Sequence, residues 1–222
     1  MQLSDLVNLV VEATGRSDKT ALIKSGINLA IEEISVARLW SDLQTTGTGT
    51  ISAGSPYLDL ESDVTRVEEA RIIDGTSSRS LLVRPKSWLL QRVPDPSSRS
   101  HSRPCYAYLE GLRLYVIPYP DVDYTVSYTY YKKHPTLTAD SDETLIRGID
   151  GAVAAYAAFW VFNSIEKAED ANRWYQTFMA RLESAKRLDA GNSVVKREAT
   201  PTQGQPYLGP DYWLDPFIRR MP

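Results

Sequence analysis

Residues 103–133 read RPCYAYLEGLRLYVIPYPDVDYTVSYTYYKK, and this stretch indicates a β-sheet. It is rich in aromatic and β-branched residues, and in 123–133 two sets of side chains alternate, which is the period of a β-strand. Glu110–Gly111 separates the first two runs and suits a tight hairpin turn. The stretch therefore predicts three consecutive strands, at 105–111, 113–118 and 123–133, the last of which has an aromatic face.

The period of two extends toward the N-terminus as far as residue 43. Short β-branched runs, separated by turn residues such as Gly54–Ser55–Pro56 and Asp74–Gly75, predict further strands. These runs lie at 43–52, 56–60, 65–74 and 80–85, followed by a short predicted helix at 86–93 and a polar loop at 97–104. A β-rich domain is therefore expected over residues 43–135.

Helical periods precede the β-rich region, in residues 1–42. Apolar residues recur three and four positions apart as far as Gly15, a residue type that commonly ends helices. A longer helix is expected from about Asp18 to Trp40. Each helix has one apolar face, so we expect both to pack on neighbouring helices.

A helical hairpin is expected after the β-rich region, in residues 136–190. Asp140 and Glu143 have the spacing of a capping box and are expected to begin its first helix. Apolar stripes then run from Ile149 to Val161 and from Ala171 to Ala185. The short link between the stripes predicts that the two helices lie antiparallel.

The last segment, residues 191–222, follows neither period but is rich in aromatic and large aliphatic side chains. Its prolines break regular structure, whereas an unfolded tail is normally poor in such side chains. The segment either folds back on its own domain or is buried by another chain, and we take the second as our hypothesis because aromatic residues are strong interface anchors. The expected contact residues are Tyr207, Tyr212, Trp213, Leu214, Phe217, Ile218, Arg219 and Arg220.

Together these segments predict an α+β fold. The N-terminal helices (1–42) and the C-terminal hairpin (136–190) are expected to form one helical bundle. A small antiparallel β domain (43–135) is inserted between them, and an extended C-terminal arm (191–222) follows. The length of 222 residues is enough for one large domain or two small ones.

Composition narrows the class of protein. The formal net charge of −3 argues against a dedicated nucleic-acid-binding protein, which normally has a basic excess. The single cysteine cannot form an internal disulfide, and no run approaches the roughly 20 apolar residues that span a bilayer. The N-terminus lacks the features of a signal peptide. A soluble protein made in the cytoplasm is therefore expected.

The sequence contains no familiar catalytic or metal-binding motif. It lacks the cysteine and histidine spacings of zinc sites and the glycine loops that bind phosphate. TGTGT at 46–50 is expected to be a polar edge strand or hairpin. His101 and His134 are expected to be solvated loop residues, and Cys105 a small buried strand residue. We therefore expect no catalytic residues, no metal, no cofactor and no enzymatic activity.

Four collinear stretches are similar to a known family. They are 20–60 together with VTRVEEARIID (64–74), then 103–133, HPTLTADSDETLIRGIDGAVAAYAAFW (134–160) and WYQTFMARLESAKR (174–187). Through them the chain resembles the head-to-tail adaptor proteins of tailed bacteriophages, also called connector, tail accessory or head-completion proteins. The chain departs from the family at His134–Pro135, where many relatives have two prolines, and from residue 191 onward it matches no family motif.

The resemblance implies a structural protein of the virion. Such adaptors form a ring, usually twelve-fold, beneath the portal at one capsid vertex, and the ring gives the tail or nozzle its attachment surface. The implied partners are other copies of the chain, the portal protein and tail or nozzle proteins, in the neck between head and tail. DNA passes through the lumen without specific binding, and no membrane is involved. In the polar loop, Arg99, His101 and Arg103 are a candidate contact with the tail or a neighbouring copy, or else part of a disordered surface loop.

Three other interpretations stay open on the sequence. The chain is a tail tube or nozzle protein further from the portal, a non-viral protein-binding module, or an enzyme of an unrecognised type. Ring formation separates the two virion readings from the others, and direct binding to a portal separates the adaptor from the tail protein. An enzyme should instead show a concave site with convergent ionisable groups whose pKa values are shifted.

Overall fold

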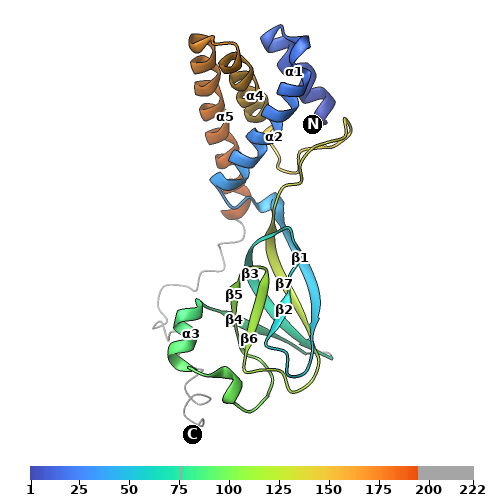
Figure 1. Ribbon diagram of the computed structural model, residues 1–222, viewed down its shortest axis with the longest axis vertical. Coiled ribbons are helices and arrows are strands. Elements are labelled where there is room, and N and C mark those ends of the chain that lie inside the picture. The colour runs from blue at the N-terminus through green and yellow to red at the C-terminus, as the bar shows by residue number, and fades with distance from the viewer. Residues whose placement is uncertain (76, 195–222) are drawn as a thin grey trace.

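The computed structural model describes residues 1–75 and 77–194, and it has a helical part and a β part that follow one another along the long axis (Figure 1). The helices are α1 (Leu3–Thr14), α2 (Thr20–Ala37), α3 (Lys86–Arg92), α4 (Asp150–Ser164) and α5 (Ala168–Val194). The strands are β1 (Gln44–Ile51), β2 (Tyr57–Asp59), β3 (Val64–Asp74), β4 (Ser77–Val83), β5 (Tyr106–Glu110), β6 (Arg113–Ile117) and β7 (Tyr124–Lys132).

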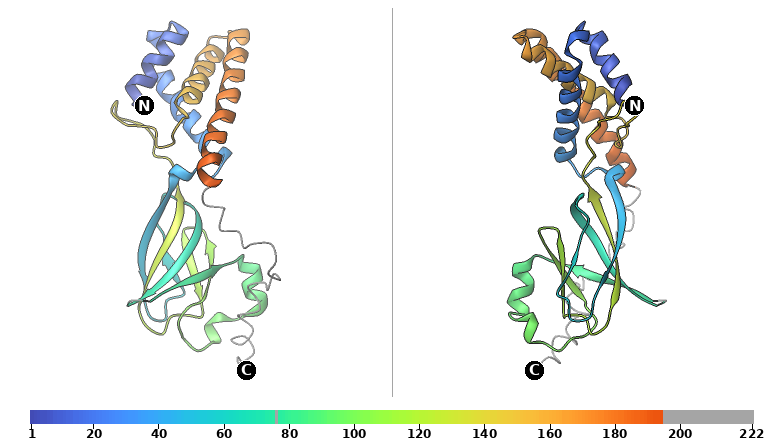
Figure 2. Two further views of the ribbon diagram at one scale, coloured as in Figure 1. Left: turned by 180° about the vertical axis from the view of Figure 1, so that it is seen from behind. Right: turned by 45° about the vertical axis from the view of Figure 1, so that its right-hand side comes forward.

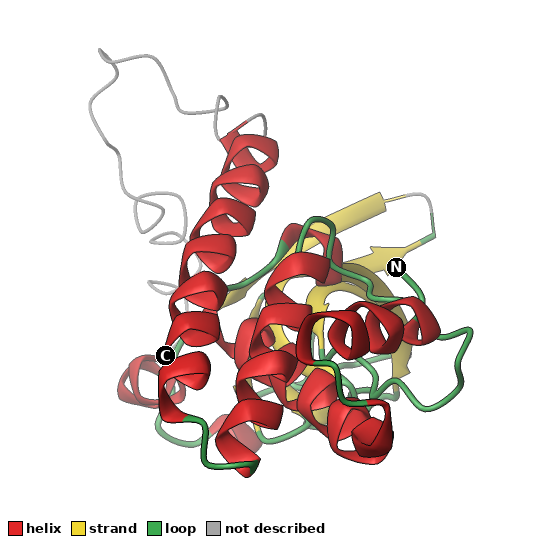
Figure 3. Cartoon of the chain, turned by 90° about the horizontal axis from the view of Figure 1, so that it is seen from above, coloured by secondary structure: helices red, strands yellow, loops and turns green. Residues whose placement is uncertain are grey.

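Four helices, α1, α2, α4 and α5, share one hydrophobic core and cover one end of the molecule (Figure 3). Helix α4 packs against all three of the others and is rich in buried alanine, which lets neighbouring helices approach closely. A close approach occurs at Gly26 of α2, where an added Cβ would lie 3.3 Å from the Cα of Ala157 and the Cβ of Trp160. Small residues at this crossing therefore set the spacing between α2 and α4.

The β part is one seven-stranded sheet within the described residues, with strand order β1-β7-β3-β4-β5-β6-β2. Neighbouring strands are antiparallel except β4 and β5, which pair in parallel through Leu82 with Tyr106 and Val83 with Ala107. The sheet curls strongly (Figure 2) and brings its two edge strands together. An added Cβ on Gly49 of β1 would lie 2.8 Å from a methyl carbon of Leu58 in β2. The sheet is therefore nearly closed into a barrel.

The expected fold class is wrong in its β part. We expected a small antiparallel domain, whereas the sheet is mixed and nearly barrel-shaped, and the strand-rich part is larger than a small insertion. The physical reason is the connection between β4 and β5, which contains α3 and is long enough for a parallel crossover. Alternation identifies each strand but does not identify its partner. The expected arm at 191–222 is largely outside the described residues, and α5 continues to Val194.

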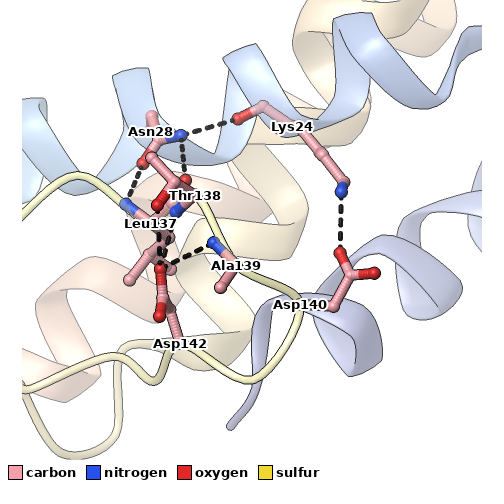
Figure 4. A network of polar contacts seen from close by, with 7 residues as sticks. All are labelled: Lys24, Asn28, Leu137, Thr138, Ala139, Asp140 and Asp142. Atoms are coloured by element: carbon pink, nitrogen blue, oxygen red, sulfur yellow. Dashed lines mark hydrogen bonds and ion pairs between the residues drawn. The ribbon is translucent and has the colours of Figure 1, made fainter.

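The first helix of the C-terminal hairpin begins later than the sequence indicates. Residues 133–149 cross the helical part as a loop, and α4 starts at Asp150. Asp140 does not cap a helix, and one carboxylate oxygen of Asp142 accepts the backbone N–H groups of Thr138 and Ala139 at 2.7 and 2.8 Å (Figure 4). The carboxylate therefore stabilises a turn of the loop, as aspartate commonly does, and the predicted capping box is wrong.

Candidate interaction surfaces

A groove of about 770 Å³ lies where α2 meets the end of β7, at the junction between the helical and β parts. One wall is α2, which presents Leu29 and Val36, followed by Leu39 just beyond the end of the helix. The other wall is the segment 131–136 that leaves β7. Val36 is 82% exposed. Exposed apolar side chains are common singly, but three along one groove indicate a surface that can be covered.

The sequence contains a signal for this groove that the motif analysis missed. The core-facing positions of α2 include Ile23, Ile27 and Ile34, whereas Leu29 and Val36 lie off that stripe. They are seven residues apart, which is two helical turns, so they share one face of α2. Exposed apolar side chains away from the core-facing stripe indicate that this side of α2 can be covered by another surface.

The junction beside the groove is fixed by buried polar contacts. Trp40 is buried and donates its indole N–H to the carbonyl of Ile34 at 2.8 Å. Arg38 donates Nη1–H to the carbonyl of Lys186 in α5 at 2.8 Å. Its Nε lies 2.9 Å from Oδ2 of Asp189, an ion pair whose geometry is not that of a hydrogen bond. The end of α2 is therefore tied to the end of α5.

Two carboxylates also belong to this junction, that of Asp189 in α5 and that of Asp42 between α2 and β1. Asp189 is only 6% exposed and accepts the backbone N–H and the hydroxyl of Ser41. Asp42 accepts Nη2–H of Arg147 at 2.7 Å and the backbone N–H of Arg147 at 2.9 Å. Burial alone would raise the pKa of Asp42, but the Arg147 hydrogen bonds outweigh it and hold the pKa below its usual value. Both carboxylates thus join the helical part to the start of the sheet.

His134 is not the solvated loop residue that we expected. It is 4% exposed, its Nε2 accepts the backbone N–H of Leu145 at 2.9 Å, and Nδ1 lies 2.7 Å from the carbonyl of Pro135. Since Nε2 is an acceptor, the proton of the neutral ring is on Nδ1, which donates to Pro135. Burial lowers the pKa of His134, and the charge of Lys132 lowers it further. The neutral imidazole therefore links the start of the 133–149 loop to Leu145, near its other end.

The loop also binds α2 directly (Figure 4). The side-chain amide of Asn28 donates to the carbonyl of Leu137 at 3.0 Å and accepts the backbone N–H of Leu137 at 2.9 Å. Lys24 forms an ion pair with Asp140 at 2.7 Å. These contacts position the far wall of the groove relative to α2, so the groove is preformed.

The predicted contact loop is held by the β part. His101 is exposed, and its ring packs over Gly54 and lies 6.0 Å from the ring of Tyr119. Arg103 is half-buried, with Nη1 3.4 Å from a carboxylate oxygen of Asp74. Arg99 is also half-buried. Of the three, His101 has the side chain most available to a partner.

The predicted contact residues between Tyr207 and Arg220 lie outside the described residues.

Besides the groove, α4 and α5 form a second candidate surface, which has aromatic character. Tyr156 and Phe159 contact the rings of Phe178 and Tyr175, with centroid distances of 5.0 Å for Tyr156–Phe178 and 5.3 Å for Phe159–Tyr175. Tyr175 and the nearby Met179 remain exposed.

Two observations concern possible metal ligands and the single thiol. In residues 1–75 and 77–194, no cluster of three or more His, Cys, Asp or Glu side chains is placed to hold a metal ion. Burial raises the pKa of the Cys105 thiol to about 11, which keeps it protonated at neutral pH. Among the described helices, none has the length and apolar character needed to cross a membrane.

Comparison with known proteins identifies a family. The family model described as SU10 adaptor protein matches residues 1–201, which is most of the 222-residue chain. A comparison with curated proteins gives no match. The four stretches that resemble phage adaptors all lie within the matched range. The chain therefore belongs to the SU10 adaptor protein family, a family of the phage head–tail adaptor type.

Proposed function

We propose that the protein is a non-enzymatic component of the virion neck, a head-to-tail adaptor that forms a ring beneath the portal and joins the capsid vertex to the tail. The observation that carries this proposal is the family match over residues 1–201, which makes the chain a phage structural adaptor. A twelve-fold ring follows from the resemblance to phage connectors. No observation favours a tail tube protein or a cellular binding module over this function.

Two unlike surfaces support assembly into a ring. Helices α2 and α5 flank α4 (Figure 1), and each presents exposed apolar side chains, on α2 beside the groove and on α5 at Tyr175 and Met179. A ring requires that one surface of each copy contacts a different surface of the next copy. The proposed ring uses the two flanks of the helical part in this way, and DNA passes through its lumen.

The C-terminal segment is the proposed docking element. It contains Tyr207, Tyr212, Trp213, Phe217 and neighbouring aliphatic and basic residues. Tyrosine, tryptophan and arginine are enriched among interface residues whose loss weakens binding most. Prolines within the segment reduce the conformational entropy that is lost on binding. The acceptor is the portal or an adjacent adaptor.

Light scattering on mixtures with a portal ring tests this function. The full-length chain is compared with a variant that stops after Val194 and so keeps all of α5. We expect the full-length chain to join the portal ring and the shortened chain to bind weakly or not at all. Equal binding of both would place the docking element elsewhere. If neither chain binds a portal or assembles with itself, the adaptor function is wrong.

A further inference from the structure

We propose that the groove between α2 and the segment 131–136 is the docking site for residues 207–218 of an adjacent copy of the chain. This inference rests on the proposed function, because the ring supplies the adjacent copy. It goes further by naming the acceptor surface and its occupant. The groove is preformed, since the contacts of Asn28 and His134 fix the loop that forms its far wall.

The apolar wall of the groove suits the aromatic segment. Leu29, Val36 and Leu39 are all exposed and all line the groove. The volume of about 770 Å³ is within the roughly 300–1,000 Å³ of pockets that bury most of an apolar ligand. Tyr212, Trp213 and the residues that follow them carry enough apolar surface to cover this wall.

The charges on the other wall complement the same segment. Lys132 and Lys133 line the groove, and among the described residues neither has an ion-pair partner. In the segment, Asp211 and Asp215 stand on either side of Tyr212, Trp213 and Leu214. A bound segment can thus place its apolar side chains against α2 and its carboxylates beside the two lysines. Complementary charge of this kind fixes the register of a bound peptide.

The place where the described chain ends favours an adjacent copy over the same copy. Arg38 both lines the groove and pairs with Asp189 of α5, so α5 ends next to its own groove. From Val194 to Tyr207 there are thirteen further steps along the chain, an extended reach of about 45 Å. Pro201 and Pro206 fix the backbone locally and disfavour a tight reversal of the chain toward its own groove. A linker of this length suits the next subunit better than a site beside its own origin.

Photo-cross-linking in an isotopically mixed oligomer tests the inference. Val36 is replaced by benzoylphenylalanine in the full-length chain, because this side chain is 82% exposed and its replacement leaves the core intact. Labelled (¹⁵N) and unlabelled chains are mixed before assembly, irradiated and digested with trypsin. Cleavage after Arg197 and Arg219 releases residues 198–219 as one peptide. We expect cross-links from position 36 to this peptide, about half of them between unlike isotopes.

A matched control uses Val122, which is also exposed and does not line the groove. The same photoreactive residue at position 122 should give no cross-link to peptide 198–219. As a second readout, Val36→Asp should weaken self-association by roughly tenfold or more, because a carboxylate would be buried against apolar side chains. Val122→Asp should leave self-association unchanged.

The outcomes separate this inference from the proposed function. Cross-links only between like isotopes would show docking within one chain and overturn the inference, as would cross-links only to another surface or to the portal. A ring that forms without any cross-link to 198–219 overturns the groove assignment and leaves the adaptor function standing. If no oligomer forms, alone or with a portal ring, the proposed function fails and the inference fails with it.

Discussion

At the scale of single residues, His134 determines how the crossing loop is held. Its ring bonds to Pro135 on one side and to Leu145 on the other, so one imidazole fixes two points of the chain that are ten residues apart. The bond from the Leu145 N–H needs the neutral ring with its proton on Nδ1, because only then is Nε2 an acceptor. A protonated ring would lose the acceptor at Nε2. The burial of His134 therefore makes the stability of the junction depend on pH.

Replacing His134 by Gln should reduce the loss of stability in mild acid. The pKa of His134 is lowered in the folded protein from an ordinary value of 6.5, so the unfolded chain binds more protons below that pH. The stabilisation is complete above about 6.5 and is lost as pH falls toward the folded pKa. Urea unfolding midpoints measured at pH 7.5 and 5.5 check this.

The matched control is His101→Gln, which changes the exposed histidine. This variant should show the wild-type decrease in midpoint between the two pH values, whereas His134→Gln should show a smaller decrease. Equal decreases in all three proteins would mean that His134 does not titrate with folding.

At the scale of elements, the near closure of the sheet depends on small residues in β1. The two glycines of TGTGT lie where other side chains cross the strand. An added Cβ on Gly47 would be 2.6 Å from Cζ of Tyr128, and one on Gly49 would meet Leu58. Tyr128 is buried, so its ring has little room to move. The absence of a Cβ at Gly47 and Gly49 allows Tyr128 of β7 and Leu58 of β2 to pack against β1.

Gly47→Ala should lower the free energy of unfolding by about 1–3 kcal/mol, the usual effect of forcing extra atoms into a packed site. Chemical denaturation followed by circular dichroism measures the change. As a control, Gly191→Ala in α5 introduces a Cβ with no atom within 4 Å, and alanine favours helix, so stability should be equal or higher. Our packing argument for β1 is wrong if both substitutions have the same effect.

At the scale of the whole molecule, a polar junction connects the helical and β parts of the described chain. Arg38, Ser41 and Asp189 join α5 to the chain between α2 and β1, and Asp42 with Arg147 joins the crossing loop to the same point. An adaptor that transmits contacts from a portal to a tail needs a fixed relation between its two ends. We infer that this junction provides it.

Arg38→Met should destabilise the protein by about 3 kcal/mol, because the buried carboxylate of Asp189 would lose its cationic partner. Urea unfolding followed by both circular dichroism and tryptophan fluorescence measures the change. The double variant Arg38→Met/Asp189→Asn should recover part of the loss, since the uncompensated charge is removed.

Arg113→Met serves as the comparison for an exposed pair. Arg113 binds Asp59 at 2.9 Å on the surface, and surface ion pairs contribute little, so no measurable change is expected. If Arg38→Met behaves like Arg113→Met, the pair with Asp189 does not hold the junction.

Patterns along the sequence predicted most of the strands and helices, although not the start of α4. Aromatic and β-branched runs separated by turn residues identified β5 and β6, alternation identified β7, and apolar stripes identified α4 and α5. The same stretches carried the resemblance to phage adaptors, and the family match confirms it at the level of the family. All of these signals are local along the chain.

Only the tertiary structure decided which elements are partners. The parallel pairing of β4 with β5, the approach of β1 to β2, the burial of His134 and the groove beside Val36 all join residues far apart in sequence. Periodicity contains no information about such pairs, since any strand of suitable pattern can accept another edge. Long-range packing determines which strands pair, because a nearly closed sheet buries apolar side chains and leaves little of its edges unpaired.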